Sequence, residues 1–154
     1  MRILIAAAGR LKERHWREAA GEYVKRLRPY ASIQVIEVPD QDLSGDEARA
    51  LRVEAEALAR AIPENAYVVG LEIGGTTRSS EAFSAWLADH LHAGRQAVAF
   101  LVGGAAGLDP ALAKRCDERL SLSPMTLPHQ LARVVLLEQL YRAFRIMRNE
   151  PYHR

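Results

Sequence analysis

The fold class is indicated most directly by residues 97–107, which read AVAFLVGGAAG. The first six are all apolar, as expected of a strand covered on both faces, which is typical of parallel sheets. Gly103, Gly104 and Gly107 follow at once, and glycines allow a chain to turn sharply and to approach a ligand closely. The spacing is neither Gly-x-Gly-x-x-Gly nor that of a phosphate-binding P-loop, so the pattern alone fits a tight turn without a ligand equally well.

On either side of this run, strand and helix patterns alternate. Strand patterns cover residues 2–8, 32–38, 66–73 and 119–122, and helix patterns cover 14–27, about 46–62, 80–93, a short stretch after Asp109-Pro110, and 128–148. This alternation predicts an α/β fold with a mostly parallel sheet of five to six strands and helices on both faces. In such sheets ligands bind beyond the carboxyl ends of the strands, so the loops after residues 73, 102 and 122 are the expected site. Ser44 with Glu47 resembles a capping box for the second helix.

The chain has 154 residues, 49% of them hydrophobic, with no long linker and no repeat, so we expect a single domain over residues 1–154. No apolar run approaches the roughly 20 residues that a membrane-spanning helix needs. Cys116 is the only cysteine, so it can neither form an internal disulfide nor build a zinc site by itself. We therefore expect a cytoplasmic protein without a metal ion.

The net charge of +2 is unevenly distributed. Residues 10–28 carry seven Lys or Arg and three Glu, residues 34–92 carry four Arg and eleven Asp or Glu, and residues 129–154 carry five Arg and two Glu. If the two basic segments meet in space, they form a surface suited to a polyanion such as RNA. Charge alone favours the simpler explanation, which is ordinary solvated helix faces.

Two further segments carry polar side chains. Residues 122–129 read LSPMTLPH, and the two prolines make a stiff loop that either holds an adenine through its backbone or simply connects a strand to a helix. In the last helix His129 and Arg133 share one face, and Glu138 and Arg142 share another. Apolar residues occur on every side of this helix, which predicts that one side packs on the sheet and another on a second subunit.

The tail 149–154 reads NEPYHR. Chain ends are usually disordered. An aromatic ring, an imidazole and a guanidinium together are nevertheless able to stack on a base and to contact a phosphate. The composition of the tail therefore leaves both a frayed end and an RNA contact open.

Taken together, these segments resemble the ribosomal RNA large subunit methyltransferase H family, part of the SPOUT superfamily of knotted methyltransferases. The resemblance covers essentially the whole chain, with Ala105 and Ala106 as a mild departure. It rests on residues 36–39 (IEVP), 71–75 (LEIGG), 101–104 (LVGG), 107–108 (GL), 120–123 (LSLS), 125–130 (MTLPHQ), 133–134 (RV), 138–143 (EQLYRA) and 151–154 (PYHR).

The resemblance implies a C-terminal trefoil knot, which nothing in the periodicity shows and which is very rare among folds. It implies methylation of N3 of a pseudouridine in large-subunit (23S) ribosomal RNA of the assembled ribosome, with both protomers of a homodimer contributing to one site. It also implies S-adenosylmethionine as cofactor, bound at the positions Leu71, Gly103, Leu122, Ser123, Pro124, Met125, Thr126 and Leu127.

N3 of a pseudouridine must lose a proton before or during methyl transfer. His129, Glu138 and His153 are candidate acceptors of this proton, while Arg133 and Arg142 are candidates to bind a phosphate or stabilise the anionic base. Tyr152 and His153 are candidates to stack on or hydrogen-bond to the nucleotide. Two alternatives remain open: a SPOUT methyltransferase acting on a different RNA base, and a non-catalytic ribosome-binding factor.

Overall fold

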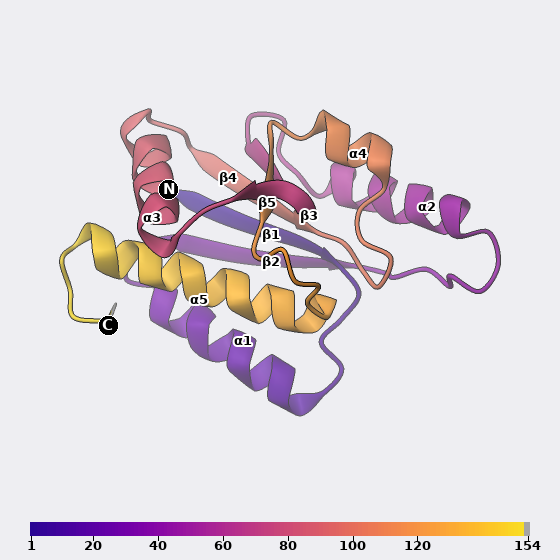
Figure 1. The fold of residues 1–154 in the computed structure, drawn as a ribbon, viewed down its shortest axis with the longest axis horizontal. Coiled ribbons are helices and arrows are strands. Elements are labelled where there is room, and N and C mark those ends of the chain that lie inside the picture. Colours follow the sequence, from indigo (N-terminus) through magenta and orange to yellow (C-terminus); the bar gives the residue numbers. More distant parts are fainter. Residues whose placement is uncertain (153–154) are drawn as a thin grey trace.

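A computed structural model describes residues 1–152. Its centre is a five-stranded sheet in the order β2-β1-β4-β3-β5, in which every neighbouring pair is parallel (Figure 1). The strands are β1 (Arg2–Ala8), β2 (Ser32–Val38), β3 (Tyr67–Thr77), β4 (Ala97–Val102) and β5 (Glu118–Ser121). The helices are α1 (Arg14–Leu27), α2 (Glu47–Arg60), α3 (Ser80–His92), α4 (Pro110–Arg115) and α5 (His129–Met147). The predicted α/β fold with a parallel sheet is confirmed.

The helices cover the two faces of the sheet unequally. Helices α1, α3 and α5 lie on one face, and α2 and α4 lie on the other (Figure 1). Successive residues of a strand point to opposite faces, so the central strands contribute to two cores. Ile5 and Phe100 pack toward α1, α3 and α5, whereas Ala6 and Leu101 pack toward α2 and α4. All six residues of β4 are buried, as its apolar sequence predicts.

Capping residues in the sequence predict where most helices begin or end, with one exception. Ser79 caps α3 by accepting a hydrogen bond from the Ala82 N–H at 3.1 Å. The capping box expected from Ser44 is wrong: Asp46 caps α2, and its carboxylate accepts from the Arg49 N–H at 3.0 Å. The physical reason is position, because Asp46 directly precedes the first helical residue while Ser44 still belongs to a turn, its N–H bonded to Asp42.

Strand β3 extends to Thr77, beyond its expected end at residue 73. Leu71 and Thr76 both pair with Leu120 of β5, so residues 72–75 make an excursion, and Figure 1 shows β3 as an arc that crosses β5. A Cβ on Gly75 would lie 2.8 Å from backbone atoms of Arg119 and Leu120. Glycine is therefore required where the arc passes the backbone of β5. The trefoil knot stays a prediction.

Helix α5 packs on the sheet between α1 and α3 (Figure 1). The Ser84 hydroxyl of α3 donates to the Ala143 carbonyl of α5 at 2.8 Å, and Tyr30, just after α1, stacks on Phe144 at 5.5 Å between ring centroids. The sheet and these two helices account for much of the apolar character around α5, which the sequence alone had assigned partly to a second subunit. The homodimer stays a prediction. No helix within residues 1–152 combines the length and apolarity needed to cross a bilayer.

Candidate functional site

The three loops that the sequence singles out begin on neighbouring strands. In the sheet, β3 lies between β4 and β5. Gly70 of β3 is in register with Leu101 of β4, and Leu71 is in register with Leu120 of β5. Parallel strands lie about 4.8 Å apart, so the β3 arc, the turn after β4 and the loop after β5 all start at one place on the carboxyl edge. This is where open α/β sheets bind ligands.

The turn after β4 is closed tightly on itself. The Gly107 N–H donates to the Gly104 carbonyl at 3.0 Å, and Gly107 has a φ of +79°, a left-handed conformation that glycine adopts readily. Gly103 is buried, and a Cβ on it would lie 2.2 Å from the Gly107 carbonyl carbon. Only glycine fits at the end of β4 without displacing this turn.

The loop after β5 leaves backbone groups free. The Ser121 hydroxyl donates to the Ser123 carbonyl at 3.0 Å, and the Ser123 hydroxyl accepts from the Met125 N–H at 2.9 Å. The backbone groups of Thr126 and Leu127 make no hydrogen bond within residues 1–152, and the Met125 residue is 77% exposed. This loop therefore offers both hydrogen-bonding groups and apolar surface to a planar ligand with polar edges.

Arg133 is buried, with only 6% of its side chain exposed. Its guanidinium donates to the Gly9 carbonyl at 3.2 Å and to the Glu37 carboxylate at 3.0 Å. Glu37 also accepts from the Leu11 N–H at 3.3 Å. Arg133 therefore ties the start of α5 to the ends of β1 and β2, an arrangement that orders the carboxyl edge and leaves its guanidinium mostly engaged.

Glu138, Arg142 and Tyr152 form a second polar cluster, here called the Glu138 group. The Glu138 carboxylate forms an ion pair with Arg142 and accepts from the Tyr152 hydroxyl at 3.1 Å. The Arg142 guanidinium lies 4.7 Å from the centroid of the Tyr152 ring, which also packs edge-on against Tyr141. Burial, followed by hydrogen bonds with Tyr23 and Glu138, raises the pKa of Tyr152 well above its usual range. This hydroxyl therefore stays protonated and able to donate near neutral pH.

The predicted catalytic residues fall into two groups within one protomer. His129 begins α5 next to the loop after β5, and Arg133 follows one turn later. Glu138 lies on the opposite side of the helix from His129 and about 13 Å further along it, so the Glu138 group does not meet His129. His153 lies outside the described residues. Among residues 1–152, no three His, Cys, Asp or Glu side chains gather as a metal site requires.

Glu54 of α2 is a polar residue near the site that the sequence analysis missed. It is only 4% exposed, and it accepts a hydrogen bond from the Gln41 N–H at 2.8 Å. Both carboxylate oxygens lie 3.8 Å from the position of a Cβ on Gly104, so Glu54 backs the turn after β4. A sequence signal existed, because Glu54 interrupts the apolar stripe formed by Leu51 and Leu58.

Comparison with known proteins supplies the last observation on this site. A family model described as "Predicted SPOUT methyltransferase" matches residues 1–153. Proteins named "Ribosomal RNA large subunit methyltransferase H" from Ruminiclostridium cellulolyticum and from Listeria monocytogenes serovar 1/2a are each 45% identical, over all of this chain and all of the relative. A crystal structure of a probable methyltransferase from Bordetella pertussis Tohama I has a TM-score of 0.56 at 15% identity, covering 92% of this chain and 95% of that one. The last likeness concerns the fold alone.

Proposed function

The chain belongs to the SPOUT methyltransferase family, and from this premise we propose that it transfers a methyl group from S-adenosylmethionine to a base of large-subunit ribosomal RNA. One observation carries the proposal: the β3 arc, the turn after β4 and the loop after β5 begin together at the carboxyl edge. This arrangement occurs in a chain with full-length relatives named for ribosomal RNA methylation.

The residues at this edge fit the methyl donor. Thr126 and Leu127 offer unpaired backbone donors and acceptors to the edge of an adenine. At the end of β4, Gly103 lets the turn close against Gly107, and Leu71 provides an apolar wall on the neighbouring strand. Residues 122–127, with Leu71 and Gly103, would hold the donor. Bound there, S-adenosylmethionine supplies an electrophilic methyl group with a sulfonium leaving group.

Because that leaving group is already good, the chain mainly has to align the acceptor base and accept the proton that the base loses. We assign His129 to this proton, since it is partly exposed and adjoins the loop at residues 122–128, here called the donor loop. Glu138 is less suited to that role, because its oxygens already accept from Arg142, Gln139 and Tyr152. The Glu138 group instead offers a guanidinium and a phenol to the anionic base or to a phosphate.

A homodimer would complete this site. Within one protomer Glu138, with Arg142 and Tyr152 bound to it, lies too far from His129 along α5 for these side chains to reach a base aligned beside His129. A second copy that places its own Glu138 group over the donor loop would unite the two sets. We accordingly propose that the protein acts as a homodimer, in which residues 1–154 of each copy form one domain, and that it works on assembled ribosomes in the cytoplasm.

The acceptor atom that we propose is N3 of a pseudouridine. Ribosomes from a strain lacking the protein are incubated with it and radiolabelled S-adenosylmethionine, and the labelled nucleotide is then identified by mass mapping. Ribosomes without the pseudouridine and free 23S RNA are the matched controls. Label on a pseudouridine of intact ribosomes only is the expected result. Label on another base would overturn the N3 assignment alone, whereas ribosome binding without donor binding or label would indicate a non-catalytic binding factor.

A further inference from the structure

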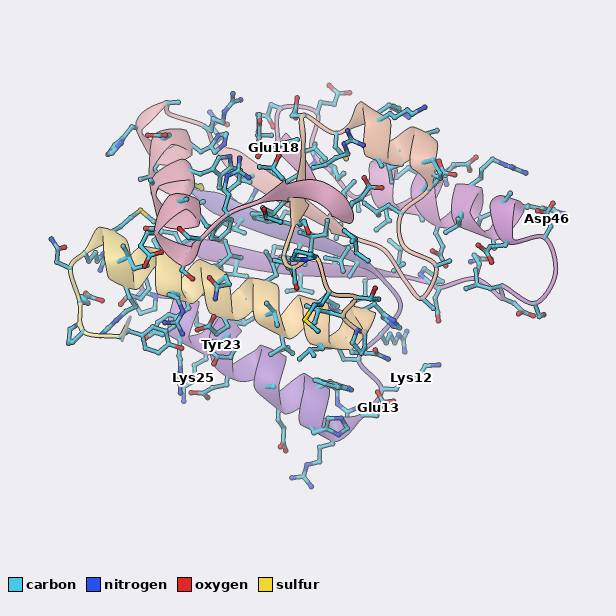
Figure 2. The ribbon with its side chains drawn as sticks, in the orientation of Figure 1. Lys12, Glu13, Tyr23, Lys25, Asp46 and Glu118 are labelled. Carbon is cyan, nitrogen blue, oxygen red and sulfur yellow. The ribbon has the colours of Figure 1, made fainter. Side chains whose placement is uncertain are left out.

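The carboxyl edge of the sheet has one basic side and one acidic side. The loop after β1 and the first turn of α1 carry Arg10, Lys12, Arg14, His15 and Arg17, here called the β1–α1 surface. The loop after β2, by contrast, carries Asp40, Asp42 and Asp46 before α2 begins. Figure 2 shows Lys12 near the start of α5 and Asp46 far from it, at the outer end of the β2–α2 loop. A polyanion approaching this edge is therefore drawn to one side of it.

The stability of α1 does not explain the cations of the β1–α1 surface. The first turn of α1 contains no acidic residue, and its N-cap Glu13 makes no side-chain capping hydrogen bond. Arg14 and Arg17 lie at the positive end of the helix dipole, where cations are unfavourable. The unfavourable interaction of Arg14 with the dipole is partly offset by its exposed ion pair with Glu18. Arg17 also donates to carbonyls of the preceding loop, so Arg14 is the cation that a partner explains better than the helix does.

The β1–α1 surface is also held in a fixed shape beside the donor loop. Arg133, near the start of α5, binds the carbonyl of Gly9, the residue that precedes Arg10. The Arg17 guanidinium donates to the carbonyls of Leu11 and Lys12. Since Arg133 follows shortly after the loop at 122–128, this network sets the distance between the donor loop and the basic side chains. Binding costs less conformational entropy when the backbone that carries the cations is already ordered.

Two cations of this surface are free to bind. Arg10 and Lys12 are exposed, and neither forms an ion pair with any residue in 1–152. The adjacent His15 and Trp16 rings lie 4.8 Å apart, and His15 is exposed. Cations beside an accessible ring suit the phosphates and bases of RNA.

We propose that the β1–α1 surface binds the phosphate backbone of the RNA substrate and so brings the RNA to the donor loop. The inference rests on the proposed function, because it takes ribosomal RNA to be the substrate. Arg10 and Lys12 contact phosphates, and the acidic β2–α2 loop excludes RNA from the other side. The occupant is RNA rather than a second copy of the chain, since this cationic surface would face its own like charge in a symmetric contact.

The test compares two double variants that each remove one exposed Arg and one exposed Lys. Arg10→Ala/Lys12→Ala alters the β1–α1 surface, and Lys25→Ala/Arg28→Ala removes the same charge at the opposite end of α1, where Figure 2 labels Lys25. Methylation of ribosomes from the strain lacking the protein is measured at several KCl concentrations. Affinity for S-adenosylmethionine is measured by calorimetry, and oligomeric state by light scattering.

For Arg10→Ala/Lys12→Ala, the ribosome KM should rise about tenfold near physiological salt, with kcat and donor affinity unchanged. The slope of log KM against log salt should flatten by about 1.4 to 1.8, the contribution of two phosphate contacts. Wild-type KM and slope in this variant, or an equal loss in the control variant, would overturn the proposal. A changed oligomeric state would also overturn it, because the surface would then join two copies. If the wild-type protein itself fails to methylate ribosomes, the proposed function fails instead.

Discussion

Replacing Gly103 with alanine is expected to weaken the binding of S-adenosylmethionine by separating the two sides of the turn after β4. The new Cβ would lie 2.2 Å from the Gly107 carbonyl carbon and 2.7 Å from the Leu108 nitrogen. An ordinary carbon contact is about 3.5 Å, so the turn or the end of β4 must move by about 1.3 Å. The neighbours are backbone atoms, which cannot rotate away as a side chain would.

The size of the effect follows from the cost of overpacking, about 1–3 kcal/mol. If the donor requires the closed turn, the same free energy is lost from binding, which corresponds to a roughly 5- to 150-fold weaker Kd. Titration calorimetry with S-adenosylmethionine measures the Kd, and thermal unfolding in the absence of donor measures the stability.

Gly74→Ala is the matched control, because a Cβ there meets nothing within 4 Å and the residue lies on the neighbouring arc. We expect this control to bind the donor as the wild-type chain does. A Gly103→Ala variant that melts lower yet keeps wild-type affinity would show that the turn is structural only. Unchanged melting together with unchanged affinity would refute the overlap itself.

Three further predictions concern the crossing, the acid response and the tail. Gly75→Ala should cost about 1–3 kcal/mol of stability in thermal unfolding, because its Cβ would lie 2.8 Å from the β5 backbone; a loss no larger than that of Gly74→Ala would contradict a close crossing. Burial lowers the pKa of His90, so below about pH 6.5 the unfolded chain binds more protons and the free energy of unfolding falls as the pH drops. His90→Gln should remove this part of the acid sensitivity in denaturant titrations at pH 7.5 and 5.5, and equal pH dependence in both proteins would refute it. Deleting residues 152–154 should abolish ribosome methylation and spare donor affinity, since Tyr152 contacts Glu138 and not the donor loop; a fully active truncated protein would rule out a role for the tail.

The candidate site was predictable in outline but not in its internal contacts. The loops after β3, β4 and β5 follow from strand order along the chain, because parallel strands present their carboxyl ends at one edge. Arg133 illustrates what this reasoning misses. It was a candidate to bind a phosphate or to stabilise the anionic base, whereas it is buried against Gly9 and Glu37, residues 124 and 96 positions away. A pattern of neighbouring residues cannot predict a hydrogen-bond partner so distant in the sequence.

The sequence by itself determined the elements and their kind. The apolar run 97–102 became a fully buried strand, the spacing of three and four over 14–27 became α1, and Asp109-Pro110 began α4. These features depend on near neighbours in the chain, through burial periodicity and capping. Tertiary structure alone decided that β3 continues past residue 73 and bends around β5 with Gly75 at the crossing, and that α1 and α3 enclose α5. Such contacts join residues far apart in the chain, so they contribute to stability only after the whole chain has packed.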